Sequence, residues 1–142
     1  MKVFLNTNVL VSGFTARGLC ADVIRLVLAE HELITGEVIL GEMERVLTKK
    51  IGLSASTTEE ILSFLETQIV EPRPNTVPAI PIRDEDDKLV LASALAAKCH
   101  VLVTGDKGLL DVADRITDLT ITDPRGFWNL IKQQRGNNRG CL

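Results

Sequence analysis

Residues 101–106 read Val101-Leu102-Val103-Thr104-Gly105-Asp106, an apolar run that ends in a threonine, a glycine and an acid. A short, fully apolar run bounded by glycine is typical of a strand that is buried on both faces of a parallel sheet. The segment before it, Asp86 to Lys98, is rich in alanine and leucine and predicts a helix. A helix that leads into a buried strand is the repeating unit of α/β folds.

The rest of the chain continues this alternation of strands and helices. Residues 2–5 predict a first buried strand, and Asn6, Thr7 and Asn8 end it with turn-forming side chains. The further elements expected are a helix over 21–30, a strand over 31–34, a helix from an N-cap at Thr35 to about Lys50, a helix opened by Ser56 or Thr57, a strand over 69–71, a short helix over 108–113, a strand over 119–122 and a last helix from Asp123-Pro124. This order predicts a three-layer α/β/α sandwich with a mostly parallel central sheet.

Length and composition favour one globular domain. The chain has 142 residues, of which 45% are hydrophobic and 25% charged, and we expect a single domain over 1–132 and a flexible polar tail over 133–142. No apolar run reaches the roughly 18 residues of a membrane span, and the first ten residues do not resemble a signal peptide. We therefore expect a protein of the cytoplasm without a membrane partner. Three cysteines without a CxxC spacing indicate neither a disulfide framework nor a zinc site.

Polar side chains follow two of the predicted strands. Asn6 comes directly after the strand over 2–5, and Asp106 follows the strand over 101–103. In parallel sheets, ligands gather outside the carboxyl ends of the strands. Ordinary structural roles also explain these residues, because asparagine is common in turns and aspartate is a common N-cap.

Two acids in predicted helices lie on or beside apolar faces. Glu42 flanks the stripe that Ile39, Met43 and Val46 form, and Asp87 shares a face with residues of its own helix that are expected to be buried. The positive end of a helix explains the acids Asp84 to Asp86 but not the direction of Asp87. Carboxylates that turn toward a core need a counter-charge, and no lysine or arginine shares these faces. A hard divalent cation such as Mg²⁺ or Mn²⁺ supplies this counter-charge. The net charge of -3 argues against a nucleic-acid partner, but a bound cation would make the charge at the site positive.

The four segments together resemble a known family over about residues 2–131. Leu5-Asn6-Thr7-Asn8-Val9-Leu10, then Glu42 in Gly41-Glu42-Met43-Glu44-Arg45-Val46-Leu47, then Asp84-Glu85-Asp86-Asp87-Lys88, then Val103-Thr104-Gly105-Asp106 are similar to the motifs of PIN domains. More narrowly, they resemble the VapC-like PIN toxins of toxin–antitoxin pairs. The resemblance implies a ribonuclease that uses Mg²⁺ or Mn²⁺ to cut RNA, forms a homodimer or higher homo-oligomer, and is held inactive by a cognate antitoxin protein.

The resemblance also assigns roles to individual positions. It implies that Asn6, Glu42, Asp87 and Asp106 form the catalytic and metal-binding set, and its auxiliary residues are Thr7, Asn8, Asp84, Thr104 and Asp111. The family's first acid falls at position 6, where this chain has asparagine, so metal binding and water activation should be weakened. Either the change was introduced to tame a toxic nuclease, or the chain is a naturally weakened member. The complete remainder of the acidic set favours the first explanation.

Two other functions fit parts of the pattern. A phosphatase of the haloacid-dehalogenase type would use Gly105-Asp106 and Asp111, but it needs an aspartate nucleophile after the first strand, where Asn6 stands. A PIN-like domain with little affinity for metal could instead act as a binding or assembly module, and Asn6 keeps this alternative open.

Overall fold

The computed structural model describes residues 1–140, and it describes side chains up to residue 136. Five parallel strands form one sheet in the order β3-β2-β1-β4-β5. The strands are β1 (Lys2–Leu5), β2 (Glu32–Gly36), β3 (Ile69–Glu71), β4 (Val101–Val103) and β5 (Thr120–Thr122). The predicted α/β class with a parallel sheet is therefore confirmed.

The sheet order reverses between its two central strands. From β1 the chain proceeds outward to β2 and β3, and it then returns to the other side of β1 to form β4 and β5. Leu5 pairs with Val103 in this central register, so both strands end at the same level. Such a reversal leaves a crevice at the carboxyl ends of the two strands, which is where open α/β sheets bind ligands.

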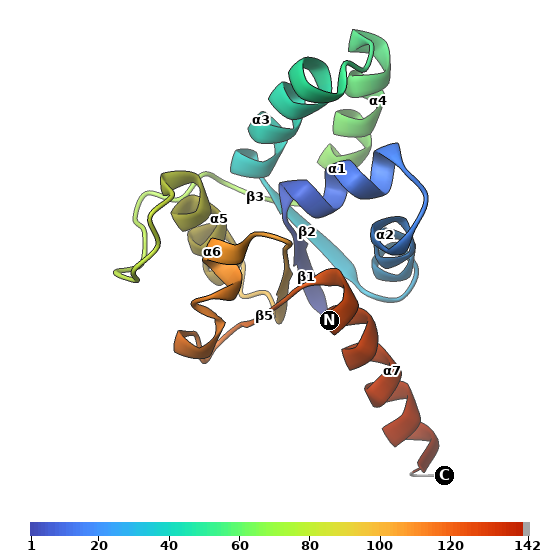
Figure 1. Ribbon diagram of the computed structural model, residues 1–142, viewed down its shortest axis with the longest axis vertical. Helices are drawn as coiled ribbons and strands as arrows, with labels where there is room; N and C mark the ends of the chain where they lie inside the picture. The colour runs from blue at the N-terminus through green and yellow to red at the C-terminus, as the bar shows by residue number, and fades with distance from the viewer. Residues whose placement is uncertain (141–142) are drawn as a thin grey trace.

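Helices cover both faces of the sheet (Figure 1). Their bounds are α1 (Thr7–Thr15), α2 (Leu19–Glu30), α3 (Glu37–Arg45), the π-helix η1 (Val46–Ile51), α4 (Ala55–Glu66), α5 (Glu85–Ala96), α6 (Lys107–Leu110), the short 3₁₀ turn η2 (Ala113–Arg115) and α7 (Pro124–Gly140). In Figure 1, α5 and α6 lie to one side of the strands and α1, α2 and α7 to the other, while α3 and α4 stand together at the top.

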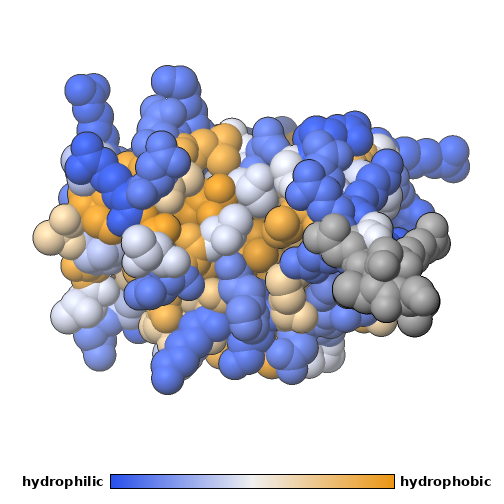
Figure 2. All heavy atoms as spheres, turned by 90° about the horizontal axis from the view of Figure 1, so that it is seen from below, coloured by the Kyte–Doolittle hydropathy of each residue, from blue (hydrophilic) through white to orange (hydrophobic). Residues whose placement is uncertain are grey.

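The core follows from the apolar strands and the inward faces of these helices. Phe4, Leu5 and Leu102 are fully buried in the sheet, and Leu91 and Phe127 cover it from α5 and α7. On the surface, hydrophilic side chains project around a band of hydrophobic residues on the face seen from below (Figure 2). No helix among residues 1–140 is both long enough and apolar enough to cross a membrane.

Three local predictions were wrong. Thr7 and Asn8, expected in a turn, begin the helix α1 over residues 7–15, because Asn6 caps this helix and its inner face is buried through Val9, Leu10 and Val11. Thr35 is not an N-cap: it lies inside β2, and α3 begins after Gly36. The helix expected to open at Ser56 or Thr57 begins at Ala55, because the Ser54 hydroxyl accepts a hydrogen bond from the Thr57 amide.

The C-terminal segment also differs from the expectation. Residues 133–140 continue α7 as a helix, where a loose tail over 133–142 was expected, and residues 141–142 lie outside the described part. Arg135 forms an ion pair with Glu30 of α2, which attaches the start of this segment to the domain. The division into a domain over 1–132 and a tail stays a prediction.

Candidate metal centre

Asn6 lies at the reversal point of the sheet, between the ends of β1 and β4. Its backbone amide donates to the Val103 carbonyl at 3.0 Å, which continues the pairing of the two strands by one residue. The side chain is 5% exposed, and both of its polar atoms have partners. Its Oδ1 accepts from the Thr7 amide at 2.8 Å, and its Nδ2 donates to the Thr104 hydroxyl oxygen at 2.8 Å. Asn6 therefore caps α1 and ties it to the end of β4.

Thr104 connects Asn6 to the loop that carries Asp106. Its side chain is fully buried, and its Oγ1 also accepts from the Asp106 amide at 3.0 Å. Asp106 in turn caps α6, because its Oδ1 accepts from the Gly108 amide at 2.8 Å. Asp106 thus has the N-cap role that the sequence predicts. This bond uses only Oδ1, and Oδ2 takes no part in it.

Asp87 comes to the same place from α5. It lies in the first turn of this helix with only 8% of its surface exposed, on the face that Leu91 and Ala94 bury completely. A methyl group placed on Gly108 would lie 3.2 Å from Asp87 Oδ2 and 3.3 Å from Asp106 Oδ1, so both carboxylates border the space above this glycine. The sequence prediction that Asp87 points toward the core is confirmed.

The proximity of these two acids changes their chemistry. The pKa of Asp87 is raised from 3.8 to about 7, first because burial disfavours its charged form and then because the charge and the hydrogen-bonding contact of Asp106 favour its proton. Two bare carboxylates about 4 Å apart repel by roughly 4 kcal/mol at an effective dielectric of 20. The pair is therefore a site where either a proton or a cation is strongly favoured.

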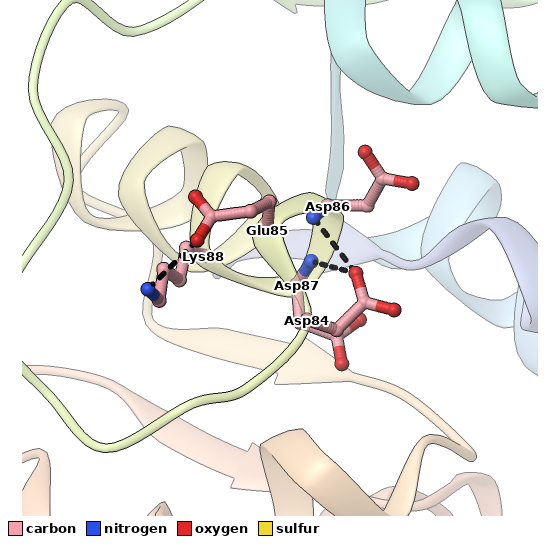
Figure 3. A network of polar contacts seen from close by, with 5 residues as sticks. All are labelled: Asp84, Glu85, Asp86, Asp87 and Lys88. Atoms are coloured by element: carbon pink, nitrogen blue, oxygen red, sulfur yellow. Dashed lines mark hydrogen bonds and ion pairs between the residues drawn. The ribbon is translucent and has the colours of Figure 1, made fainter.

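Asp84 adds a third acid beside the pair. Its Oδ1 caps α5 by accepting from the Asp86 and Asp87 amides at 2.8 and 3.2 Å. Figure 3 shows the side chains of Asp84 and Asp87 on the same side of the helix start, with Asp86 directed away from them. Glu85 instead forms an ion pair with Lys88 at 3.0 Å. Asp84 therefore adds negative charge near Asp87 while it stabilises the helix that presents Asp87.

Glu42 lies apart from the aspartate pair, on α3. Its Oε2 accepts from the Thr7 hydroxyl at 3.1 Å, so the start of α1 lies between Glu42 and Asn6. Burial is the main reason why the pKa of Glu42 is raised, and the charges of Asp86 and Asp84 raise it further. Glu42 is also one of the charges that raise the pKa of Asp87, so the two acids act on each other without touching.

Two auxiliary residues hold or border the Asp106 loop. The Asn8 Oδ1 accepts from the Gly105 amide at 3.1 Å, which fastens this loop to α1. Asp111 forms an ion pair with Lys107 at 3.3 Å, one helical turn apart on the surface. Sequence reasoning named both residues but not these contacts, because each contact depends on where α1 and α6 begin.

The structure thus brings the predicted site residues into three neighbouring groups. The first group is Asp84, Asp87 and Asp106, which border a hollow of about 390 Å³ that Asp111 also lines. The second is Asn6, which is hydrogen-bonded to Thr104, and the third is Glu42, which is hydrogen-bonded to Thr7. Among the side chains described, those of residues 1–136, no three acidic, histidine or cysteine groups are close enough to act as one ligand set. Glu42 therefore does not share a single ligand set with the two aspartates.

This donor set fits a hard divalent cation. Mg²⁺ is bound through one or two carboxylates and keeps several of its waters, so an aspartate pair at an open hollow meets its requirement without a third protein ligand. The space over Gly108, which a Cβ would fill, lies between the two carboxylates. Asp87 and Asp106 are therefore the residues that would hold the cation.

Comparison with known proteins agrees with this fold. The family model described as PIN domain matches residues 2–108, which include all four motifs. A search of curated proteins finds no match. Among solved structures, a chain of VapBC2 from Rickettsia felis, bound to a DNA fragment from its promoter, is similar with a TM-score of 0.62 and 15% identity over 87% of this chain and 98% of that chain. A chain of VapBC-1 from nontypeable Haemophilus influenzae is similar with a TM-score of 0.58 and 17% identity over 88% of this chain and 99% of that chain. At these identities the structural likeness concerns the fold alone. Because the family model matches most of the sequence, the chain belongs to the PIN domain family.

Proposed function

We propose that this chain is a divalent-cation-dependent endoribonuclease with Asp87 and Asp106 as its principal metal ligands. The observation that carries the proposal is the contact between these two carboxylates at the reversal point of the sheet, where Asp87 has a pKa raised to about 7. Mg²⁺ or Mn²⁺, when bound, would activate water and polarise the phosphodiester. Family membership supports a nuclease, and cation binding at this pair agrees with its electrostatics.

The chain's own residues would divide the remaining tasks. The Thr104 hydroxyl oxygen holds Asp106 in place by accepting a hydrogen bond from the Asp106 backbone amide. Asp84 accepts one from the Asp87 amide and so fixes the start of α5, with Asp87 facing the hollow. Glu42, with its raised pKa and its bond to Thr7, is placed to accept a proton from the attacking water through its other oxygen. Asn6 keeps the hydrogen bonds of the site but adds no charge, which should weaken cation binding.

The resemblance and the structural neighbours extend the proposal to a biological setting. Both neighbours are chains of VapBC assemblies, and we propose that this chain is likewise the toxin of a toxin–antitoxin pair, with RNA as substrate, a homo-oligomeric state and a cognate antitoxin. The cytoplasm, where such a substrate is found, stays the predicted location.

The Asn6→Asp variant tests the catalytic proposal. An aspartate there would accept from the Thr104 hydroxyl and add a negative charge beside Asp106, so Mn²⁺-dependent cleavage of single-stranded RNA should rise by at least about tenfold. The double variant Asn6→Asp/Asp106→Asn is the control, and it should return cleavage to the level of the present chain. Equal and negligible rates for all three proteins would refute the nuclease proposal.

Asn6 also supports one alternative, a PIN-like module that binds or assembles without catalysis. With Asn6 both polar atoms of the side chain are used inside the protein, so this position offers no carboxylate to a cation. Calorimetry with Mn²⁺ separates the two functions. Heat of binding from Asn6→Asp supports the nuclease, whereas no heat from either protein supports the module.

A further inference from the structure

A second hollow, of about 420 Å³, lies between α1 and the π-helix η1. One bank is the exposed face of α1, where Asn8, Ser12 and Thr15 follow one another at helical spacing. The opposite bank consists of Val46, Lys50 and Ile51. Its size falls within the range of small-molecule sites. Its lining contains none of the aspartates of the metal centre.

The hollow adjoins residues of the candidate metal centre at one end. Thr7 and Glu42 both line it, and the hydrogen bond between them joins it to the acidic region. Asn8 lines it as well, while its Oδ1 holds the Gly105 amide of the loop that leads to Asp106. A chain molecule that places a phosphate at Asp87 and Asp106 can therefore extend past Glu42 into this space.

The lining of the hollow combines apolar side chains with a few polar groups. Val11, Val46 and Ile51 provide apolar surface, and Ile51 is 47% exposed although it is a large hydrophobic residue. The Ser12 hydroxyl and the Asn8 amide nitrogen have no hydrogen-bond partner within the described residues, so they are available to a ligand. An apolar surface with a few hydrogen-bonding groups beside it suits a flat, polar-edged nucleobase.

Lys50 gives the hollow its positive charge. It is exposed, and it forms no ion pair with any side chain in the described part of the chain. By contrast, the hollow of about 360 Å³ between α3 and α4 is lined by Glu44, Glu59 and Glu66 and by no lysine or arginine. The hollow between α1 and η1 can accept a phosphate beside Lys50, whereas the hollow between α3 and α4 repels one.

The backbone of η1 agrees with a binding role. Residues 46–51 leave the α-helical pattern for a π-helix, which ends at Gly52 in the left-handed region with φ of 79°. Short π-helical turns are rare and often occur at functional sites.

We infer that the hollow between α1 and η1 binds one nucleotide of single-stranded RNA next to the scissile phosphate. The base lies against Val11, Val46 and Ile51, and Lys50 pairs with the backbone phosphate of the same nucleotide. This inference rests on the proposed ribonuclease function and adds a substrate subsite to it. The hollow would give the enzyme a preference for the base on one side of the cut.

Filling the hollow tests the base contact. The affinity of Ser12→Phe for a short, fluorescein-labelled single-stranded RNA, measured by fluorescence anisotropy in EDTA, should fall by roughly tenfold, as for the loss of one stacked base. Ser63→Phe is the matched control, because Ser63 is also exposed on a helix but lines the glutamate hollow. It should leave the affinity within about twofold of the parent value, and Ile51→Ala, a milder change, should lower it if Ser12→Phe fails to fold.

Replacing Lys50 tests the phosphate contact. In Lys50→Gln, the slope of log affinity against log salt should become shallower by about 0.7, the value for one phosphate of a single strand. Lys49→Gln is the control, because Lys49 is the adjacent exposed lysine of η1 and does not line the hollow. Equal slopes for the two variants, with unchanged RNA affinity in Ser12→Phe and Ile51→Ala, overturn the inference and leave the hollow as a surface for a protein segment.

A small substrate separates failure of this inference from failure of the proposed function. Bis(4-nitrophenyl) phosphate is a phosphodiester without a base, so its hydrolysis by Asn6→Asp with Mn²⁺ reports the metal centre alone. No hydrolysis means that the proposed function fails. Hydrolysis together with unchanged RNA affinity in the hollow variants means that only the subsite is wrong.

Discussion

Replacing Asp87 with asparagine should stabilise the protein in the absence of metal. The folded-state pKa of Asp87 is about 7, above its unfolded value of 3.8, so its contribution to stability is fully present below pH 3.8 and is lost as the pH rises toward 7. The shift corresponds to about 4 kcal/mol at about 1.4 kcal/mol per pKa unit, and screening by solvent in the open hollow reduces this to about 2 kcal/mol. The asparagine side chain of this variant would carry no charge, and its amide can donate to the Asp106 carboxylate.

The assay is thermal unfolding in EDTA over a range of pH. At pH 8, Asp87→Asn should unfold at a temperature higher by roughly 5–10 °C, because about 2 kcal/mol is gained in a chain of this size. The gain should shrink as the pH falls below 7 and vanish near pH 3, where Asp87 is neutral in both states. Addition of Mn²⁺ should stabilise the parent chain but not the variant.

Asp86→Asn is the control for this experiment. Asp86 lies one residue earlier in the first turn of α5 but is exposed and directed away from Asp84 and Asp87. Its replacement should lower stability slightly, by about 0.5 kcal/mol, since it removes a favourable interaction with the helix dipole. A loss of stability in metal-free Asp87→Asn at pH 8, with the Mn²⁺ effect retained, would refute the reasoning that these carboxylates are held together against their repulsion.

Three further changes have expected outcomes that denaturant unfolding can check. Asn6→Asp should lower metal-free stability by about 1–2 kcal/mol at pH 8, because it buries another charge near Asp87, and excess Mn²⁺ should reverse the loss; stability unaffected by Mn²⁺ would contradict this. Gly13→Ala should cost about 1–3 kcal/mol, because its Cβ would lie 2.2 Å from Ile24 Cδ1 and 3.0 Å from the Cys20 carbonyl oxygen of the α2 backbone, and a neutral result would show that the helices separate easily. Thr35→Val should raise stability by about 1 kcal/mol, because the fully buried Thr35 hydroxyl has no partner within the described residues, and a loss would indicate a bond formed through water.

The central part of the fold was predictable because its strands are short, apolar and bounded by turn residues. The run from Val101 to Val103 is buried throughout, and its pairing with β1 brings Asn6 and Thr104 together at one edge. The helical phase of Asp87 relative to Leu91 was enough to place it on a buried face. These inferences needed only strand order and helix periodicity.

The parts that failed depend on tertiary packing. Asn6, Thr7 and Asn8 have turn propensity, yet the buried face that follows them makes α1 a helix, and the bond from Thr7 to Glu42 exists only because α1 lies next to α3. The π-helix η1 has no signal in its composition, so the hollow beside it could not be foreseen. Asn8 was named as an auxiliary residue by resemblance, but its bond to Gly105 follows from the position of two loops distant in sequence.

A crystal of the protein soaked in Mn²⁺ and measured at a wavelength where manganese scatters anomalously tests the central claim most directly. We expect one strong peak within coordination distance of the Asp87 and Asp106 carboxylates, beside Gly108, and a stronger peak at the same place in Asn6→Asp. A peak only at other surface acids, such as the glutamates between α3 and α4, or no peak in either protein, would contradict the claim that this pair is the cation site.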